Sequence, residues 1–269
     1  MSAPPADPPI EDFHVEESGS GPTLLLQHGL AGSARNWGPQ VRALRERYRL
    51  VRFDARGHAR TAKKGMAGRH GLAEFVGDFG RIADAHAGAE PFVAGGLSLG
   101  AAVALHHALA APERVRGLVL AAIAPGRGAG AGFTARADAF AAAIDTRGLD
   151  AAGEEFVWGP RSGLDPGAAK LVRQGFLEHP PEALAAILRE TIAELPRVGE
   201  LADSLRELRI PTLVVVGTAD RGSLDPCREL ADRLPEATLV EIEGAGHVVN
   251  LAAPAAFNEA LEAFLARLG

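Results

Sequence analysis

The stretch Gly96-Leu97-Ser98-Leu99-Gly100 lies between an apolar, β-rich run at residues 91–95 and an alanine-rich segment of helical pattern at residues 99–111. In a turn from a strand to a helix, G-x-S-x-G is typical of a nucleophilic serine, and an ordinary glycine-rich turn is the alternative. Glycines are needed because side chains two positions from Ser98 would collide with the neighbouring strand and helix. We expect the helix that begins at Leu99 to direct free N–H groups toward negative charge developing beside Ser98.

Short β-rich runs alternate with longer helical patterns along the chain, and this alternation predicts an α/β fold with a mostly parallel sheet flanked by helices. The β-rich runs are residues 23–27, 50–53, 91–95, 118–120, 212–216 and 238–242. The helical patterns are residues 41–47, 72–86, 99–111 and 254–268.

The alternation is interrupted once, between about residues 125 and 196, where a helical pattern contains no β-rich run. We interpret this part as a helical insertion at residues 126–196, with the α/β core formed by residues 1–125 and 197–269. The insertion opens with a glycine-rich stretch at residues 126–132, which by composition is a flexible hinge. Its spacing does not fit G-x-G-x-x-G, because Ala131 and Phe133 occupy the positions that need glycine, so we expect no dinucleotide and no other cofactor.

Composition narrows the class of protein. The 269 residues are 47% hydrophobic and 23% charged, which is ordinary for a globular protein. The formal net charge is −6 and no basic block occurs, so neither a nucleic acid nor a membrane surface is an expected partner, and the oligomeric state stays open. The only cysteine, Cys227, cannot form an internal disulfide, and residues 1–7 lack the features of a signal peptide. We therefore expect a cytoplasmic protein that acts on a small molecule.

A serine nucleophile needs a base to remove its proton and an acid to orient that base. His247 follows the last β-rich run in Gly244-Ala245-Gly246-His247, and Asp220 follows residues 212–216 in Gly217-Thr218-Ala219-Asp220. Because the carboxyl ends of parallel strands meet at one edge of a sheet, Ser98, Asp220 and His247 can converge there. Asp225 is a rival acid, and Cys227 is interpreted as a structural residue.

A second turn, Gln27-His28-Gly29-Leu30-Ala31-Gly32-Ser33, follows the first long β-rich run. We expect the Leu30 N–H and the Leu99 N–H to bind the oxyanion together. His28 is interpreted as a structural residue that braces this turn, because His247 already fills the position of the base. His106 and His107 point about 100° apart on the predicted helix, so no metal site is expected.

The chain resembles the α/β-hydrolase superfamily, in the cap-bearing group that includes 3-oxoadipate enol-lactonases and related esterases. The matching pieces are His28-Gly29, Asp54-Ala55-Arg56-Gly57-His58-Ala59-Arg60-Thr61, the turn at Ser98, Gly217-Thr218-Ala219-Asp220 and Gly244-Ala245-Gly246-His247. Ala59 and Thr61 depart from the D-x-R-G-x-G-x-S pattern of the family. The resemblance implies the α/β-hydrolase fold, with residues 126–196 as its helical cap.

The resemblance also limits the reaction. Serine stands at position 98, where dehalogenases and epoxide hydrolases of the superfamily carry aspartate, so cleavage of a small carboxylic ester or lactone through an acyl-enzyme is expected. Hydrolytic C–C cleavage of a diketone-like substrate and ligand binding without turnover are the alternatives. Substrate specificity should lie in the cap. There the aromatic residues Phe133, Phe140, Phe156 and Trp158 could line the substrate pocket or form the cap's own core.

Overall fold

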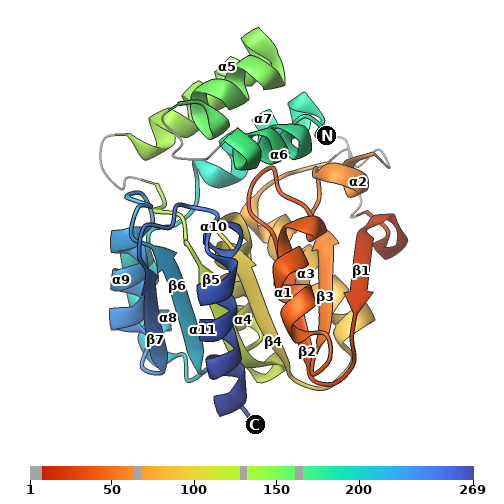
Figure 1. Cartoon of the computed structure of the whole chain (residues 1–269), viewed down its shortest axis with the longest axis vertical. Coiled ribbons are helices and arrows are strands. Elements are labelled where there is room, and N and C mark those ends of the chain that lie inside the picture. The colour runs from red at the N-terminus through yellow and green to blue at the C-terminus, as the bar shows by residue number, and fades with distance from the viewer. Residues whose placement is uncertain (1–7, 64–67, 128–131, 161–165) are drawn as a thin grey trace, which may run out of the picture.

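The computed structural model of the chain describes residues 8–63, 68–127, 132–160 and 166–269. Within these residues seven strands form one sheet in the order β1-β3-β2-β4-β5-β6-β7 (Figure 1). The strands are β1 His14–Ser18, β2 Thr23–Gln27, β3 Arg49–Asp54, β4 Phe92–Leu97, β5 Val115–Ala121, β6 Thr212–Gly217 and β7 Ala237–Ile242. All neighbouring pairs except β1–β3 are parallel, which confirms the predicted fold class.

The edge strand β1 was absent from the sequence prediction. It runs antiparallel to β3, with Glu16 opposite Arg52. Its sequence, His-Val-Glu-Glu-Ser, contains one apolar residue, and none of its residues is buried. A half-exposed edge strand has little apolar surface to cover, and the sequence of β1 lacks the apolar run by which the six other strands were found.

Helices cover both faces of the sheet. On one face, α1 (Gly38–Leu44) and α11 (Pro254–Arg267) bury apolar side chains together with Trp37, and on the other lie α3 (Leu72–Ile82), α4 (Leu99–Ala110) and α9 (Leu224–Arg233). Because both faces are covered, Leu24, Leu25 and Leu26 of β2 are all fully buried. The remaining core helices are α2 (Ala59–Ala62), α8 (Ala202–Glu207), α10 (Val249–Ala252), η1 (Ile10–Asp12), η2 (Ala34–Trp37), η3 (Ala83–Ala87), η4 (Pro112–Arg114) and η7 (Val198–Leu201).

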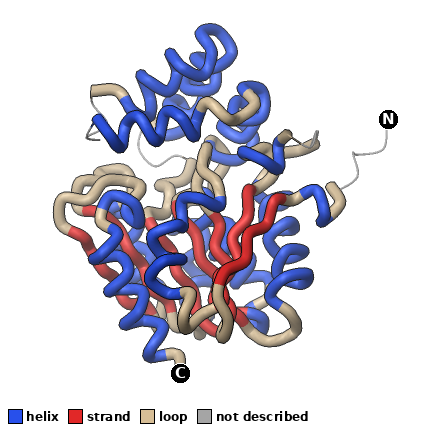
Figure 2. The backbone as a smooth tube through the Cα atoms, turned by 45° about the vertical axis from the view of Figure 1, so that its right-hand side comes forward, coloured by secondary structure: helices blue, strands red, loops and turns tan. Residues whose placement is uncertain are grey.

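The described residues between β5 and η7 form helices and no strand. They are α5 (Phe133–Gly153), η5 (Glu154–Trp158), α6 (Pro166–Phe176), α7 (Pro181–Ile187) and η6 (Leu188–Ile192). We call this group the helical segment. It lies beyond the carboxyl-terminal ends of the parallel strands (Figures 1 and 2). The exact division of the chain into a core and a cap stays a prediction, and residues 128–131 of the proposed hinge lie outside the described residues.

Four aromatic residues of the helical segment, Phe140, Phe156, Trp158 and Phe176, pack on one another, and Phe133 has no ring contact with them among the described residues. Phe140 stacks on Phe156, with ring centroids 4.7 Å apart, and on Phe176 at 5.9 Å. Trp158 meets Phe176 edge-on at 5.3 Å, and its ring lies so close to Gly153 that any side chain there would overlap it. These rings therefore supply the segment with a core of its own. None of the described helices has both the length and the apolar composition that a membrane crossing requires.

Candidate active site

Ser98 lies in the predicted turn between β4 and α4. Its backbone has φ 55° and ψ −111°, a conformation that is strained for a residue with a side chain. A Cβ on Gly96 would lie 2.1 Å from the backbone carbon of Gly100, and a Cβ on Gly100 would lie 2.2 Å from the carbonyl oxygen of Gln27. Both glycines are thus required by close backbone approach. The first N–H groups of α4, including that of Leu99, have no partner within the helix.

Asp220 and His247 are in direct contact. The imidazole Nδ1 of His247, in the loop between β7 and α10, lies 2.7 Å from Oδ2 of Asp220, which follows β6. Burial by itself would raise the pKa of Asp220, but the hydrogen bonds from His247 and Ser223 hold it below the usual value. The carboxylate is therefore ionised and accepts the Nδ1 hydrogen. A neutral imidazole held in this way has its free lone pair on Nε2, as a general base requires.

The loops that carry Asp220 and His247 are fastened to each other. The Ala219 N–H donates to the Ala245 carbonyl at 3.0 Å, and the Gly244 N–H donates to the Thr218 hydroxyl at 2.9 Å. A Cβ on Gly217 would lie 2.1 Å from the Ala245 carbonyl oxygen, so only glycine permits this approach. Backbone contacts therefore set the distance between the acid and the base.

Ser98 is connected to these loops through the end of β5. The Ser98 N–H donates to the carbonyl of Ala121 at 2.8 Å, and the next carbonyl, that of Ala122, accepts from the Ser223 hydroxyl at 3.3 Å. Ser223 in turn lies 3.4 Å from Nδ1 of His247. No hydrogen bond joins Ser98 to His247 directly in the described part of the chain. Such contacts often tighten only when substrate is bound.

Sequence comparison identifies the family. Residues 24–260 match the model of the alpha/beta hydrolase family, and Ser98, Asp220 and His247 all lie within this range. The chain belongs to the alpha/beta hydrolase family.

Relatives and solved structures support the hydrolase assignment. The chain is 30% identical over 266 residues to a protein of Azorhizobium caulinodans named "Putative carbamate hydrolase RutD", with 94% of each chain covered. A thermophilic esterase from Thermogutta terrifontis, solved with malate bound, has a TM-score of 0.82 at 26% identity over 95% of this chain and 93% of that one. The enol-lactonase from Burkholderia xenovorans LB400 shares the fold, with a TM-score of 0.79 at 24% identity over 94% and 96% of the chains. The protein is a hydrolase enzyme of the α/β fold.

In this alpha/beta hydrolase, the buried side chain of His28 stabilises the turn after β2 through hydrogen bonds to the backbone. The Nδ1–H of His28 donates to the Gly29 carbonyl at 2.7 Å, and its Nε2 accepts from the Ala55 N–H at 3.0 Å. Burial lowers the pKa of His28 to about 4, so the ring is neutral. Both nitrogens have backbone partners, which agrees with the interpretation of His28 as a brace rather than a base.

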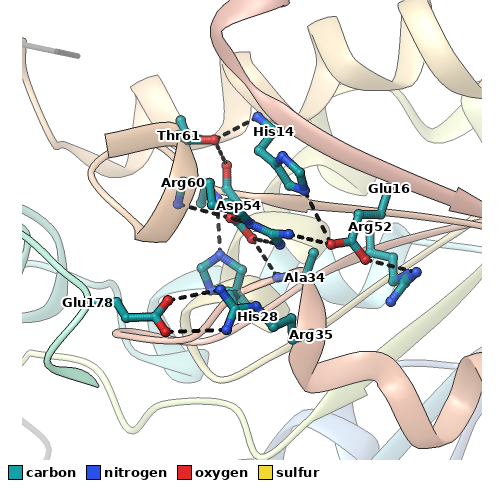
Figure 3. A network of polar contacts seen from close by, with 12 residues as sticks. His14, Glu16, His28, Ala34, Arg35, Arg52, Asp54, Arg60, Thr61 and Glu178 are labelled. Carbon is teal, nitrogen blue, oxygen red and sulfur yellow. Dashed lines mark hydrogen bonds and ion pairs between the residues drawn. The ribbon is translucent and has the colours of Figure 1, made fainter. Parts of the chain in front are cut away.

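The carboxylate of Asp54 fixes the next part of this turn. It accepts from the Ala34 N–H at 2.7 Å and from Arg60, whose Nε lies at 2.8 Å (Figure 3). Burial alone would raise the pKa of Asp54, but the hydrogen bonds from Arg60 and Ala34 and the nearby His28 lower it. Ala59, which stands where the family pattern has glycine, adopts a left-handed φ of 40°. The departure from the pattern therefore leaves a strained alanine in an intact turn.

Ser223 was missed by the sequence analysis. It is 1% exposed, and its hydroxyl contacts both the Ala122 carbonyl and the imidazole of His247. Its N–H also lies 3.4 Å from Oδ1 of Asp220. No sequence signal points to it, because a lone serine in the stretch between Asp220 and Pro226 carries no pattern of its own.

The other candidate residues fall elsewhere. Asp225 is exposed at the start of α9, where its Oδ1 lies 3.7 Å from Nη1 of Arg228. The carboxylate that contacts His247 is that of Asp220. Burial raises the pKa of Cys227 to about 12, which leaves the thiol unreactive and agrees with a structural role. The ring contacts of Trp158 lie within the helical segment, and its predicted contact with substrate stays a prediction. No cluster of metal-ligating side chains occurs among the residues that the structure describes.

Proposed function

We propose that this hydrolase cleaves a small carboxylic ester or lactone through an acyl-enzyme on Ser98. The observation that carries the proposal is the 2.7 Å contact between Asp220 and His247 in loops tied, through Ser223 and the end of β5, to the strained turn at Ser98. An ionised acid, a base oriented by it and a serine hydroxyl in a strained strand-to-helix turn are the parts that acyl transfer requires.

In the proposed mechanism the Ser98 oxygen attacks the substrate carbonyl while Nε2 of His247 takes the hydroxyl proton. The backbone N–H groups of Leu30 and Leu99 bind the oxyanion that forms. Collapse of this intermediate breaks the bond to the alkoxide leaving group, which receives the proton from His247. Water, deprotonated by His247, then attacks the acyl-enzyme and releases the carboxylic acid and the free Ser98 hydroxyl.

A carbamate is the second candidate substrate, because the relative from Azorhizobium caulinodans carries that activity in its name and is matched over 94% of both chains. The same residues would attack the carbamate carbonyl. A panel of nitrophenyl esters, simple lactones, alkyl carbamates and vinylogous diketones separates the candidates. Turnover of esters or lactones is the expected result, with a pre-steady-state burst of nitrophenol from the nitrophenyl esters. Cleavage confined to diketones would identify a C–C hydrolase instead.

Labelling with a fluorophosphonate tests the nucleophile. We expect one label per chain, located on Ser98 by peptide mass mapping, with no label on Ser98→Ala. Asp220→Asn should lower kcat roughly 10⁴-fold, because the imidazole is then held in the wrong tautomer. Ser204→Ala is the matched control, since Ser204 is exposed on α8.

Labelling at another serine, or turnover that survives Ser98→Ala, would contradict the proposal. Absence of label and of turnover on the whole panel, in folded protein that still binds a ligand, would instead identify a binding protein without catalysis.

A further inference from the structure

The turn between α6 and α7 of the helical segment contacts the turn that follows β2. Nε2 of His179 lies 3.1 Å from the carbonyl oxygen of Gly32, and the ring is almost fully buried. Next to it, Glu178 forms a two-pronged ion pair with Arg35, at 2.9 Å and 3.4 Å, which is largely exposed to solvent (Figure 3). Of these two neighbouring residues, His179 touches the proposed oxyanion turn, whereas Glu178 pairs with Arg35 in η2, beyond that turn.

The direction of the Leu30 N–H is set by the carbonyl of Gly29, because both belong to one planar trans peptide and point in opposite directions. That carbonyl accepts two hydrogen bonds, from Nδ1 of His28 at 2.7 Å and from the Gly32 N–H at 3.0 Å. Between them Ala31 has a left-handed φ of 56°. The turn therefore keeps its shape only while Gly32 stays in place.

His179 is held rigidly enough to keep Gly32 in place. Its ring packs edge-on against His58, with centroids 5.4 Å apart at 87°, and His58 packs against His28 at 4.9 Å. The other ring nitrogen, Nδ1, lies 3.0 Å from the Gly175 carbonyl oxygen and 3.1 Å from that of Phe176. The ring is therefore in contact with carbonyl groups of α6 on one side and with the ring of His58 on the other.

The ring has carbonyl oxygens on both sides but one hydrogen to give them when it is neutral. Burial lowers the pKa of His179 despite its backbone hydrogen bonds, which favours the neutral ring. The position of that single hydrogen decides the role of the residue. If the hydrogen is on Nε2, the ring donates to the Gly32 carbonyl in the core. If it is on Nδ1, the ring donates to the Gly175 and Phe176 carbonyls, which belong to the helical segment.

We propose that His179 is a positioning residue of the oxyanion hole, which donates from Nε2 to the Gly32 carbonyl and so maintains the direction of the Leu30 N–H. The helical segment would then contribute to catalysis at a residue that touches neither substrate nor Ser98. This inference rests on the proposed function, because it assumes that the Leu30 N–H binds an oxyanion.

Three variants at one position test it. His179→Gln places an amide N–H near the position of Nε2, His179→Asn places one near Nδ1, and His179→Ala removes both. We expect His179→Ala and His179→Asn to lower kcat for an ester about 10- to 100-fold with KM little changed. This loss is smaller than the roughly 10²- to 10³-fold loss for removing an oxyanion donor outright, because the Leu30 N–H is displaced but still present. His179→Gln should keep kcat within about threefold of the parent, since it retains the donor to Gly32.

Affinity for a trifluoromethyl ketone, which forms an oxyanion on the serine, should fall in parallel with kcat across the three variants. A purely structural role would change the melting temperature without this parallel. Glu178→Gln is the matched control, because it removes the adjacent exposed ion pair and should change kcat by about twofold or less.

The inference is wrong if His179→Asn preserves kcat as well as His179→Gln does, or if all three variants retain the parent's kcat and ketone affinity. It is also wrong if kcat falls in all three while ketone affinity stays constant. Should His179→Ala fail to fold, the comparison of the Gln and Asn variants still decides. Failure of the proposed function is recognised separately, because the parent protein would then show no fluorophosphonate label on Ser98.

Discussion

At the residue scale, the turn that carries Ser98 depends on two neighbouring residues without side chains, Gly96 and Gly100. Ser98 has a left-handed φ of 55° in a turn where glycine alone fits at two positions. Gly96 lies against the backbone of Gly100, and Gly100 lies against the backbone of Gln27 at the end of β2. Strain of this kind costs on the order of 1–3 kcal/mol and persists only where the surrounding structure enforces it. The strained conformation of Ser98 is therefore maintained by packing of backbone against backbone.

Gly96→Ala should destabilise the protein and abolish turnover. A methyl group 2.1 Å from the Gly100 backbone forces β4 and α4 apart, at a cost of about 3 kcal/mol or more. Urea unfolding and ester turnover measure the two effects. Gly77→Ala is the control: Gly77 is an exposed residue inside α3 with nothing within 4 Å of an added Cβ, so this change should stabilise by roughly 0.5–1 kcal/mol. Equal stability of the two variants would contradict the explanation.

Ser223→Ala should lower kcat/KM about tenfold, the value of one ordinary hydrogen bond, because the imidazole of His247 loses one of the two groups that face Nδ1. Steady-state kinetics on an ester, beside Ser204→Ala, measures the effect. A kcat/KM equal to that of the control would show that Asp220 orients the imidazole by itself.

At the scale of elements, two turns are joined by buried neutral histidines. His28, after β2, and His58, after β3, pack edge to face with ring centroids 4.9 Å apart. Burial lowers the pKa of His58 well below the usual value, as it does for His28. Neutral rings suit this place, because their nitrogens donate to the Gly29 and Arg56 carbonyls without bringing charge into the core.

Stability should therefore fall on mild acidification. The folded pKa of His28 is about 4, whereas the unfolded value is near 6.5, so between these pH values only the unfolded chain takes up the proton. The free energy of unfolding should decrease as pH falls through this window, by on the order of 3 kcal/mol from His28 alone once pH reaches about 4. Urea unfolding at a series of pH values measures the slope. His28→Gln should flatten it, and an unchanged slope in that variant would contradict the assignment.

At the scale of the whole molecule, the parallel sheet places the ends of β2, β3, β4, β6 and β7 at one edge, where the helical segment meets them (Figure 1). Asp54 is the main polar link in this region. It connects the end of β3 to the oxyanion turn through Ala34, and Arg60 extends the network to Glu16 on the edge strand (Figure 3).

Asp54→Asn should destabilise the protein by about 3 kcal/mol and lower ester turnover as well, because it leaves Arg60 without its buried counter-charge and loosens the turn that carries Leu30. Thermal unfolding and kinetics measure both effects. Asp203→Asn is the matched control. Its carboxylate is 96% exposed and pairs with Arg206 on the surface, so its loss should cost within about 0.5 kcal/mol. A similar melting temperature for the two variants would argue against Asp54 as a link between elements.

Local patterns in the sequence were sufficient for the six parallel strands, for α1, α3, α4 and α11, and for the position of Ser98 between β4 and α4. The spacing of apolar residues and the glycines that bound turns are features of a few neighbouring residues. They can therefore be read from the sequence without knowing how distant parts of the chain pack. The same reasoning placed His247 and Asp220 after their strands. It failed for β1, whose polar sequence becomes a strand only because β3 offers it an edge.

Tertiary structure alone decided which side chains meet. The contact of His247 with Asp220 spans 27 positions, and that of His179 with Gly32 spans 147. Neither Ser223 nor His179 belongs to a motif, and each gains its role from an atom that another loop brings within hydrogen-bonding distance. Such contacts depend on how loops pack after the sheet and helices are in place, and periodicity along the chain carries no information about that packing.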